Sequence, residues 1–301
     1  MPPGLRSSLA LVGALLAAPS CGGPRPPPSD DEPAAPSAIS RTLGVREPVR
    51  LGDQAEAWVA AIARAGAESD RVRAGGYVEC APVAELEGAH ACGSSTREAM
   101  NEGLVRASLF AEGNFGAVRG VLLALDDDAT RDGMALADGH DLRGEALAAF
   151  WSAATDACVR EGPRFCPSPR ERELFEGYVL PRLARGAPLA LLGFSVETRA
   201  TLGHEVLHAQ YFLVGTFRAG TDAFWDARVA PEDQARARTL LAFAYDVTEP
   251  ALVRNEFMAY VLMPGAERAL LRDLVPRYRA PLHAELVARG APPLEPDLPP
   301  P

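Results

Sequence analysis

The chain has 301 residues and a formal net charge of −10, and hydrophobic residues make up 48% of it, an ordinary fraction for a soluble domain. All of its 30 basic side chains are arginines, and they form no basic block or stripe that could neutralise phosphates, which argues against a nucleic-acid partner. The stretch 45–290 contains no Pro/Gly/Ser-rich linker and is long enough for one sizeable core, so we expect a single domain there.

The first 21 residues have the features of a secretion signal. Arg6 supplies a positive charge, and the apolar run 9–18 is too short to cross a bilayer, which takes about 20 residues. Small residues then precede Cys21, and this pattern resembles a bacterial lipobox, in which the cysteine becomes the lipidated first residue. Ala18 and Pro19 are unusual there, so plain secretion and a buried hydrophobic N-terminal segment are the alternatives. We expect an exported protein that a lipid anchors to a membrane of the bacterial cell envelope, periplasmic or on the surface.

Proline-rich segments flank the predicted domain. Residues 22–44 follow the candidate anchor directly, and their prolines favour an extended, disordered tether that lets a domain stand off a membrane. Residues 291–301 have a similar composition and are predicted to form a disordered tail.

Four further cysteines form an even set, which in an exported protein indicates two disulfides. Three pairings are possible. We favour Cys80–Cys92 and Cys158–Cys166, because each closes a short local loop, and four reduced thiols are the alternative. A cysteine-based zinc cluster is not indicated, since no CxxC spacing occurs.

The domain is predicted to be mainly α-helical. Apolar residues recur at helical spacing, and caps or prolines punctuate the pattern, which predicts helices over 53–64, 96–112, 142–159, 169–185, 195–214, 231–246, 252–263, 266–274 and 281–289. Ser195 is the expected cap of the helix 195–214. The run 121–125 is too short to assign to a strand or to a helix end, and strand signals are thin elsewhere.

His204-Glu205-Val206-Leu207-His208 is an HExxH pattern within one of these helices. Two residues four apart lie on the same helix face, so both imidazoles can bind one Zn²⁺. Glu205 follows the first ligand and can reach a water at the metal, where its carboxylate would act as general base. The pattern therefore predicts a zinc site, and two ordinary histidines are the alternative.

A catalytic zinc usually takes three protein ligands, so the third must come from another segment. Glu256 is the strongest candidate, because it lies in an otherwise apolar helix where a buried carboxylate needs a partner. A salt bridge from Glu256 to Arg254 is the alternative interpretation. Weaker candidates in loop-like sequence are Asp222, Asp226 and Glu249. The acidic run 126–128 is interpreted as a loop rather than a cation site.

HExxH followed by a glutamate in an Asn-Glu string resembles the gluzincin metallopeptidases over residues 197–263. The resemblance implies a zincin-like helical domain, a peptide or protein substrate, Glu205 as base, and His204, His208 and Glu256 as zinc ligands.

The chain departs from the gluzincin pattern in two ways. The interval from His208 to Glu256 is longer than in the thermolysin-like members. Ala259-Tyr260 also replaces the aspartate that usually follows the third ligand, so no residue is assigned to hold the His204 ring. A peptidase further needs a hydrogen-bond donor for the developing oxyanion. The candidates are Tyr260, one turn beyond Glu256, and Tyr278 and His283.

Three functions follow, in order of preference. The first is a zinc-dependent metallopeptidase of the bacterial cell envelope. The second is a zinc-binding envelope lipoprotein without hydrolytic activity, which acts as an adaptor or scaffold. The third is a ferritin-like di-iron protein, because the string from Glu205 to His208 is also ExxH. That site would need a second ExxH on a long helix, and the other instance, Glu87 to His90, lies in a Gly- and Cys-bearing segment.

Overall fold

The structure is a computed structural model that describes residues 43–70, 76–263, 270–296 and 298, so the predicted signal, Cys21 and nearly all of the predicted tether lie outside it. It is mainly helical, as predicted. It also contains a sheet that we did not predict, which has five strands within the described residues, in the order β1-β2-β3-β5-β4. The strands are β1 (Leu43–Val45), β2 (Val78–Pro82), β3 (Ala89–Ser94), β4 (Gly139–Arg143) and β5 (Ala190–Ser195).

The sheet is mixed. β1 pairs in parallel with β2 and β3 with β5, whereas β2–β3 and β4–β5 are antiparallel. The inner strand β5, which lies between β3 and β4, is buried at every residue. A strand with both faces buried shows no alternation of polar and apolar residues, which removes the signal by which short strands are recognised. β4 is an edge strand and, in the part of the chain that the structure describes, pairs only with β5.

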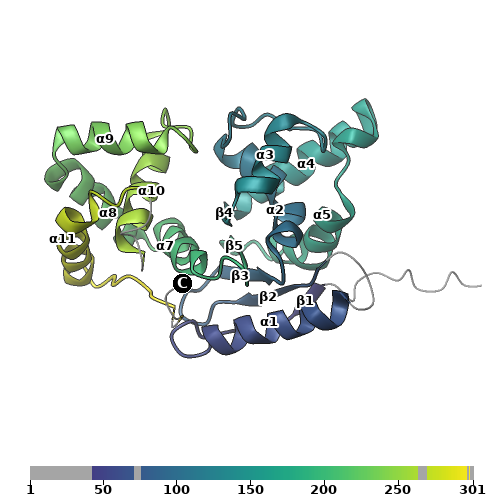
Figure 1. The fold of residues 1–301 in the computed structure, drawn as a ribbon, viewed down its shortest axis with the longest axis horizontal. Coiled ribbons are helices and arrows are strands. Elements are labelled where there is room, and N and C mark those ends of the chain that lie inside the picture. The colour runs from purple at the N-terminus through teal and green to yellow at the C-terminus, as the bar shows by residue number, and fades with distance from the viewer. Residues whose placement is uncertain (1–42, 71–75, 264–269, 297, 299–301) are drawn as a thin grey trace, which may run out of the picture. The chain divides into compact units, whose positions relative to one another are not determined.

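Helices cover both faces of the sheet (Figure 1). On one face, α1 (Ala55–Asp70) and α7 (Thr201–Leu213) bury Trp58, Ile62, Leu202 and Val206 against β3 and β5. The opposite face packs on α2 (Arg97–Glu112), α4 (Gly144–Glu161) and α5 (Pro169–Leu174). Smaller elements on that side are α3 (Asp128–Leu136), the 3-10 turn Pro163–Phe165, the π turn Phe175–Val179 and α6 (Leu180–Leu183).

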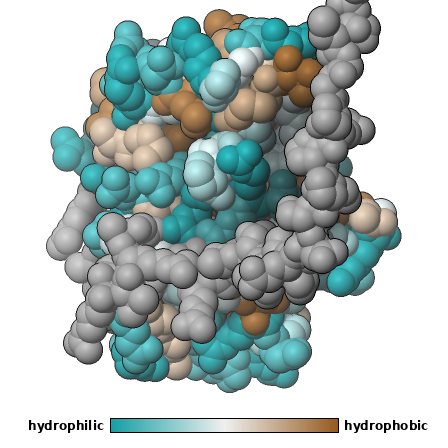
Figure 2. All heavy atoms as spheres, turned by 90° about the vertical axis from the view of Figure 1, so that its right-hand side faces the viewer, coloured by the Kyte–Doolittle hydropathy of each residue, from teal (hydrophilic) through white to brown (hydrophobic). Residues whose placement is uncertain are grey.

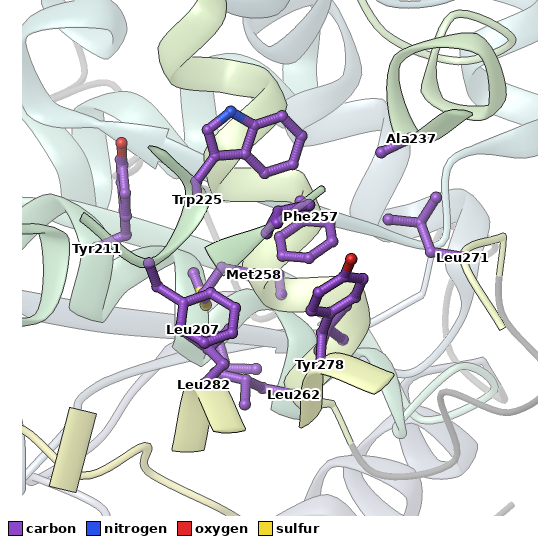
Figure 3. Packing of buried hydrophobic residues seen from close by; sticks show 14 of the residues in the cluster. Leu207, Tyr211, Trp225, Ala237, Phe257, Met258, Leu262, Leu271, Tyr278 and Leu282 are labelled. Atoms are coloured by element: carbon purple, nitrogen blue, oxygen red, sulfur yellow. The ribbon is translucent and has the colours of Figure 1, made fainter. Parts of the chain in front are cut away.

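A second core joins α7 to the C-terminal helices (Figure 3). It involves α8 (Gly215–Arg228), α9 (Pro231–Leu241), α10 (Pro250–Leu262) and α11 (Val275–Ala288). Phe257 lies at its centre, with ring centroids 4.9 Å from Trp225 and 5.7 Å from Tyr278. α7 therefore contributes to two cores and is buried on several sides, as its apolar sequence requires.

Several predicted helix boundaries are corrected by the structure. Ser195 ends β5 instead of capping a helix, and α7 begins only at Thr201. Leu142 belongs to β4, so the predicted helix 142–159 starts at Gly144. The predicted helix 169–185 is divided by the π turn, 121–125 is irregular, and 281–289 is the second half of α11. α3 and α8 were not predicted. Of the predicted helix 266–274, residues 266–269 lie outside the described residues, and 270–274 form turns instead of a helix.

Both predicted disulfides are present. Cys80–Cys92 joins paired residues of β2 and β3, and Cys158–Cys166 ties α4 to the segment before α5. Two disulfides are consistent with an oxidising compartment. No described helix combines the length and the apolar character needed to cross a membrane. Figure 2 shows one face of the molecule, on which hydrophobic residues lie in small groups among hydrophilic ones.

Candidate metal centre

The two histidines of the HExxH pattern lie one turn apart on α7, with both rings buried. Their Nε2 atoms are 2.9 Å apart, and their ring centroids are separated by 4.5 Å. Burial lowers the pKa of both His204 and His208 to about 4. Both imidazoles are therefore neutral at physiological pH, which is the form that binds a metal ion.

Glu256 of α10 completes this group. Its carboxylate oxygens lie 3.6 Å from His204 Nε2 and 3.6 Å from His208 Nε2, and its side chain is 1% exposed. The alternative salt bridge to Arg254 is not formed, because that guanidinium pairs with Asp226 at 2.8 Å and Asp222 at 3.7 Å. The donor atoms of His204, His208 and Glu256 lie within 4.8 Å of one another, so they could hold a metal ion.

The chemistry of these residues fits a divalent metal. Glu256 Oε2 and the Nδ1 atoms of both histidines are buried without a hydrogen-bond partner. Two neutral imidazoles and one carboxylate are the donor set of a catalytic zinc site that leaves a position open. A buried carboxylate with one oxygen unpartnered is costly unless a cation offsets its charge.

Glu205 lies beside the three candidate ligands and is 5% exposed. It packs against β4 at Gly139, where an added Cβ would lie 2.2 Å from Glu205 Oε1, so a larger residue there would displace the Glu205 side chain. Burial, with a further contribution from the charge of Glu256, raises the pKa of Glu205 well above its usual value. A carboxylate with raised proton affinity beside a metal centre has the property that a general base needs.

Three residues of the site were missed by the sequence analysis. Asp141 of β4 lies with its Oδ2 3.8 Å from His208 Nδ1, and Glu112 ends α2 close to it. Burial, and then the charge of Glu256, raises the pKa of Glu112 to about 8. Tyr245 places its hydroxyl 3.1 Å from that of Tyr260. No recognisable motif surrounds any of the three. Asp141 lies in β4, which was not predicted, and Glu112 and Tyr245 lie near the ends of the predicted helices 96–112 and 231–246, so nothing in the sequence indicated that the three meet at one site.

Of the three oxyanion candidates, only Tyr260 lies at the site. Its ring centroid is 4.6 Å from that of His204. Tyr278 instead donates its hydroxyl to Asp233 at 2.6 Å in the C-terminal core, and His283 is exposed on α11. The weaker ligand candidates also lie in other contacts: Asp222 accepts from Tyr211, Asp226 pairs with Arg254, and Glu249 pairs with Arg119.

The second ExxH string does not form a helical site. His90 lies in β3, and its Nδ1 is 2.9 Å from the Tyr178 hydroxyl. The acidic run 126–128 pairs with two arginines, Arg131 and Arg164, as expected of a solvated loop.

Two cavities adjoin the candidate metal centre. One, of about 460 Å³, is lined by His204, Glu205 and Tyr260 together with apolar side chains that include Phe115, Leu136 and Phe243. The other, of about 560 Å³, is lined by Glu112, Asp141 and Asn255 and by charged groups further out. Residues of β4 and α7 contribute to both, so the candidate metal centre has room for a ligand along the edge of the sheet.

Comparison with known proteins adds no family to this description: no protein-family model, curated protein or solved structure matches the chain.

Proposed function

We propose that the protein is a zinc-dependent peptidase of the bacterial cell envelope. The observation that carries the proposal is the convergence of His204, His208 and Glu256 in one buried cluster with Glu205 alongside. Zinc, when bound, supplies polarisation of a carbonyl and activation of water near neutral pH. The alternative of a non-catalytic zinc-binding adaptor needs the same ligands, but gives no reason for a buried Glu205 or for cavities beside them.

The chain's own residues have distinct roles in this proposal. Glu205 takes a proton from the attacking water and passes it to the leaving amine. Tyr260, whose ring lies against His204, donates its hydroxyl to the carbonyl oxygen as negative charge develops there. Tyr245 positions that hydroxyl through the contact between the two phenol groups.

The edge strand β4 favours an extended peptide as the substrate. The main chain of Gly144 donates to Leu189 at 2.7 Å, which continues the β4–β5 pairing by one residue. Because main-chain groups alternate in direction along an antiparallel strand, Gly139, Asp141 and Arg143 turn theirs away from β5. A peptide added at this edge would pair with them and pass directly beside Glu205.

Location in the envelope rests on the signal-like residues 1–21, the lipobox-like Cys21 and the two disulfides, which form where the environment is oxidising. The lipid anchor would hold the domain at a membrane through the proline-rich tether.

The variant Glu205→Gln tests the peptidase proposal, because it keeps the size of the side chain and removes its basic oxygen. We expect hydrolysis of a peptide library to fall by at least about 100-fold while one zinc per chain is retained. Glu232→Gln, an exposed residue of α9, is the matched control and should cleave at the parent rate. Cleavage by Glu205→Gln at the parent rate would show that the assigned base is wrong.

A further inference from the structure

The Nδ1 side of the His208 ring faces a carboxyl group, that of Asp141, which the three-ligand site does not use. Nε2 of this ring faces His204 and Glu256, whereas Nδ1 faces Asp141 Oδ2 at 3.8 Å. Both Nδ1 and Oδ2 are buried, and neither has a hydrogen-bond partner. Leaving a buried donor or acceptor unpaired is destabilising, so two such atoms that face one another require a physical explanation.

Metal binding supplies that explanation. A histidine that gives its Nε2 lone pair to a metal carries its hydrogen on Nδ1, and that N–H needs an acceptor. The present separation exceeds a hydrogen bond by less than about 1 Å, so a small rotation of the imidazole closes it.

We propose that Asp141 is a positioning residue for the metal centre: its carboxylate accepts the Nδ1–H of His208, and Glu112 in turn holds that carboxylate. The inference rests on the proposed metal site, but it does not depend on peptidase activity. The side chains of Asp141 and Glu112 are in hydrogen-bond contact, so Glu112 limits the orientations that the Asp141 carboxyl group can take beside the His208 ring. The two carboxyl groups that would hold the His208 ring belong to β4 and α2, and neither lies on α10, the helix that carries the third ligand.

Asn255 is the competing acceptor. Its Oδ1 is buried and unpartnered, and its side chain contacts His208. A neutral amide oxygen forms a weaker hydrogen bond than a carboxylate does, so Asp141 should dominate.

The experiment measures metal affinity by chelator competition with zinc, and ligand geometry by the visible absorption of the Co²⁺-substituted protein. We expect affinity to fall by about 10-fold in Asp141→Asn and by about 100-fold in Asp141→Ala, with altered Co²⁺ bands in both. Glu112→Gln should weaken binding by about 3- to 10-fold without touching Asp141 itself. Glu145→Gln is the matched control. Glu145 lines the same cavity as Asp141 and Glu112 but is exposed, so this variant should have the zinc affinity and Co²⁺ bands of the parent.

A purely structural role for Asp141 predicts a different result, namely a lower thermal midpoint of the metal-free variants. We expect those midpoints to stay within about 3 °C of the parent. If Asp141→Ala does not fold, Glu112→Gln alone decides. Parental affinity and Co²⁺ bands in the Asp141 and Glu112 variants would overturn the inference, as would an effect confined to Asn255→Ala.

The number of metal ions bound per chain tests whether Asp141 is itself a ligand. Asp141, Glu205 and His208 also lie within 4.8 Å of one another. Two ions per chain, of which Asp141→Asn removes one, would make Asp141 a ligand and overturn the inference. A parent that binds zinc but cleaves no peptide contradicts the proposed function and leaves this inference intact.

Discussion

Glu256 is the residue that turns a pair of histidines into a three-donor site. If its carboxylate is the third ligand, Glu256→Ala should lower zinc affinity by at least about 100-fold, because a two-histidine site lacks the negative charge that offsets the cation. Chelator competition on the purified protein measures this. Asp226→Asn is the control, since this aspartate was a rival candidate and pairs with Arg254 instead. Equal losses in both variants would argue against Glu256.

His140 shows what burial does to a histidine outside the metal centre. Its ring lies between Ser108 Oγ, 2.7 Å from Nδ1, and Asn101 Oδ1, 2.8 Å from Nε2. Burial lowers its pKa to about 3. An unfolded histidine has a pKa near 6.5, so on acidification the unfolded state binds the proton first. Stability is therefore lost as the pH falls from about 6.5 towards 3, by at most about 1.4 kcal/mol per pH unit.

His140→Gln should remove this part of the acid sensitivity. Between pH 6.5 and 5 the metal-free parent should lose about 2 kcal/mol more of its free energy of unfolding than the variant. Urea unfolding at the two pH values measures the difference, in which the contributions of the other buried histidines cancel. Parallel losses in the two proteins would show that His140 does not titrate as described.

The sequence predicted those residues of the site that belong to a recognisable pattern, and it missed the others. His204, Glu205 and His208 have a fixed spacing that the helix converts into geometry, and Glu256 was conspicuous as an acid among apolar residues. Asp141 and Glu112 looked like ordinary surface acids. They reach the site only because β4 lies at the sheet edge next to α7 and because α2 ends there. Pairing between distant segments leaves no local trace in the sequence.

At the scale of elements, helix periodicity predicted most helices, whereas every strand was missed. The helices are long enough for apolar residues to repeat several times, and Thr96 caps α2 by accepting from the main chain of Ala99 at 3.1 Å. The strands β2 to β5 have only five or six residues each. With β5 buried on both faces, the sheet gave no alternating pattern by which to detect it.

A buried ion pair joins two of these elements. Arg106 of α2 donates to Glu171 of α5 at 2.9 Å, and the two side chains are 1% and 2% exposed. Arg106 also donates to three main-chain carbonyls, those of Leu123, Phe165 and Cys166. Removing one partner of such a pair leaves the other charge buried and uncompensated.

Arg106→Ala should therefore lower the free energy of unfolding by about 3–5 kcal/mol, measured by urea denaturation. The control is Arg131→Ala, which removes an exposed arginine that pairs with Asp128, and its effect should stay within about 0.5 kcal/mol. A loss in Arg106→Ala no larger than that of the control would mean that the pair does not hold α2 and α5 together.

At the scale of the whole molecule, the proposed anchor makes a prediction about location. If Cys21 is lipidated, Cys21→Ser should lose incorporation of labelled palmitate and move from the membrane fraction to the soluble extracytoplasmic fraction, because a folded domain without an acyl anchor has no comparable membrane affinity. Fractionation of cells that express the full chain tests this. A serine variant that still sediments with membranes would mean that another contact retains it.

The acids and imidazoles around the metal centre come from α2, β4, α7 and α10, which are far apart in the chain. No single segment of the chain supplies the complete set of donors. The site therefore forms only when the sheet and the C-terminal helices have both folded, because it does not exist in an unfolded polypeptide. A chain secreted before it folds would thus arrive empty and be metallated at its destination. Any metal that it binds there would reflect the supply in that compartment as well as the preference of its donors.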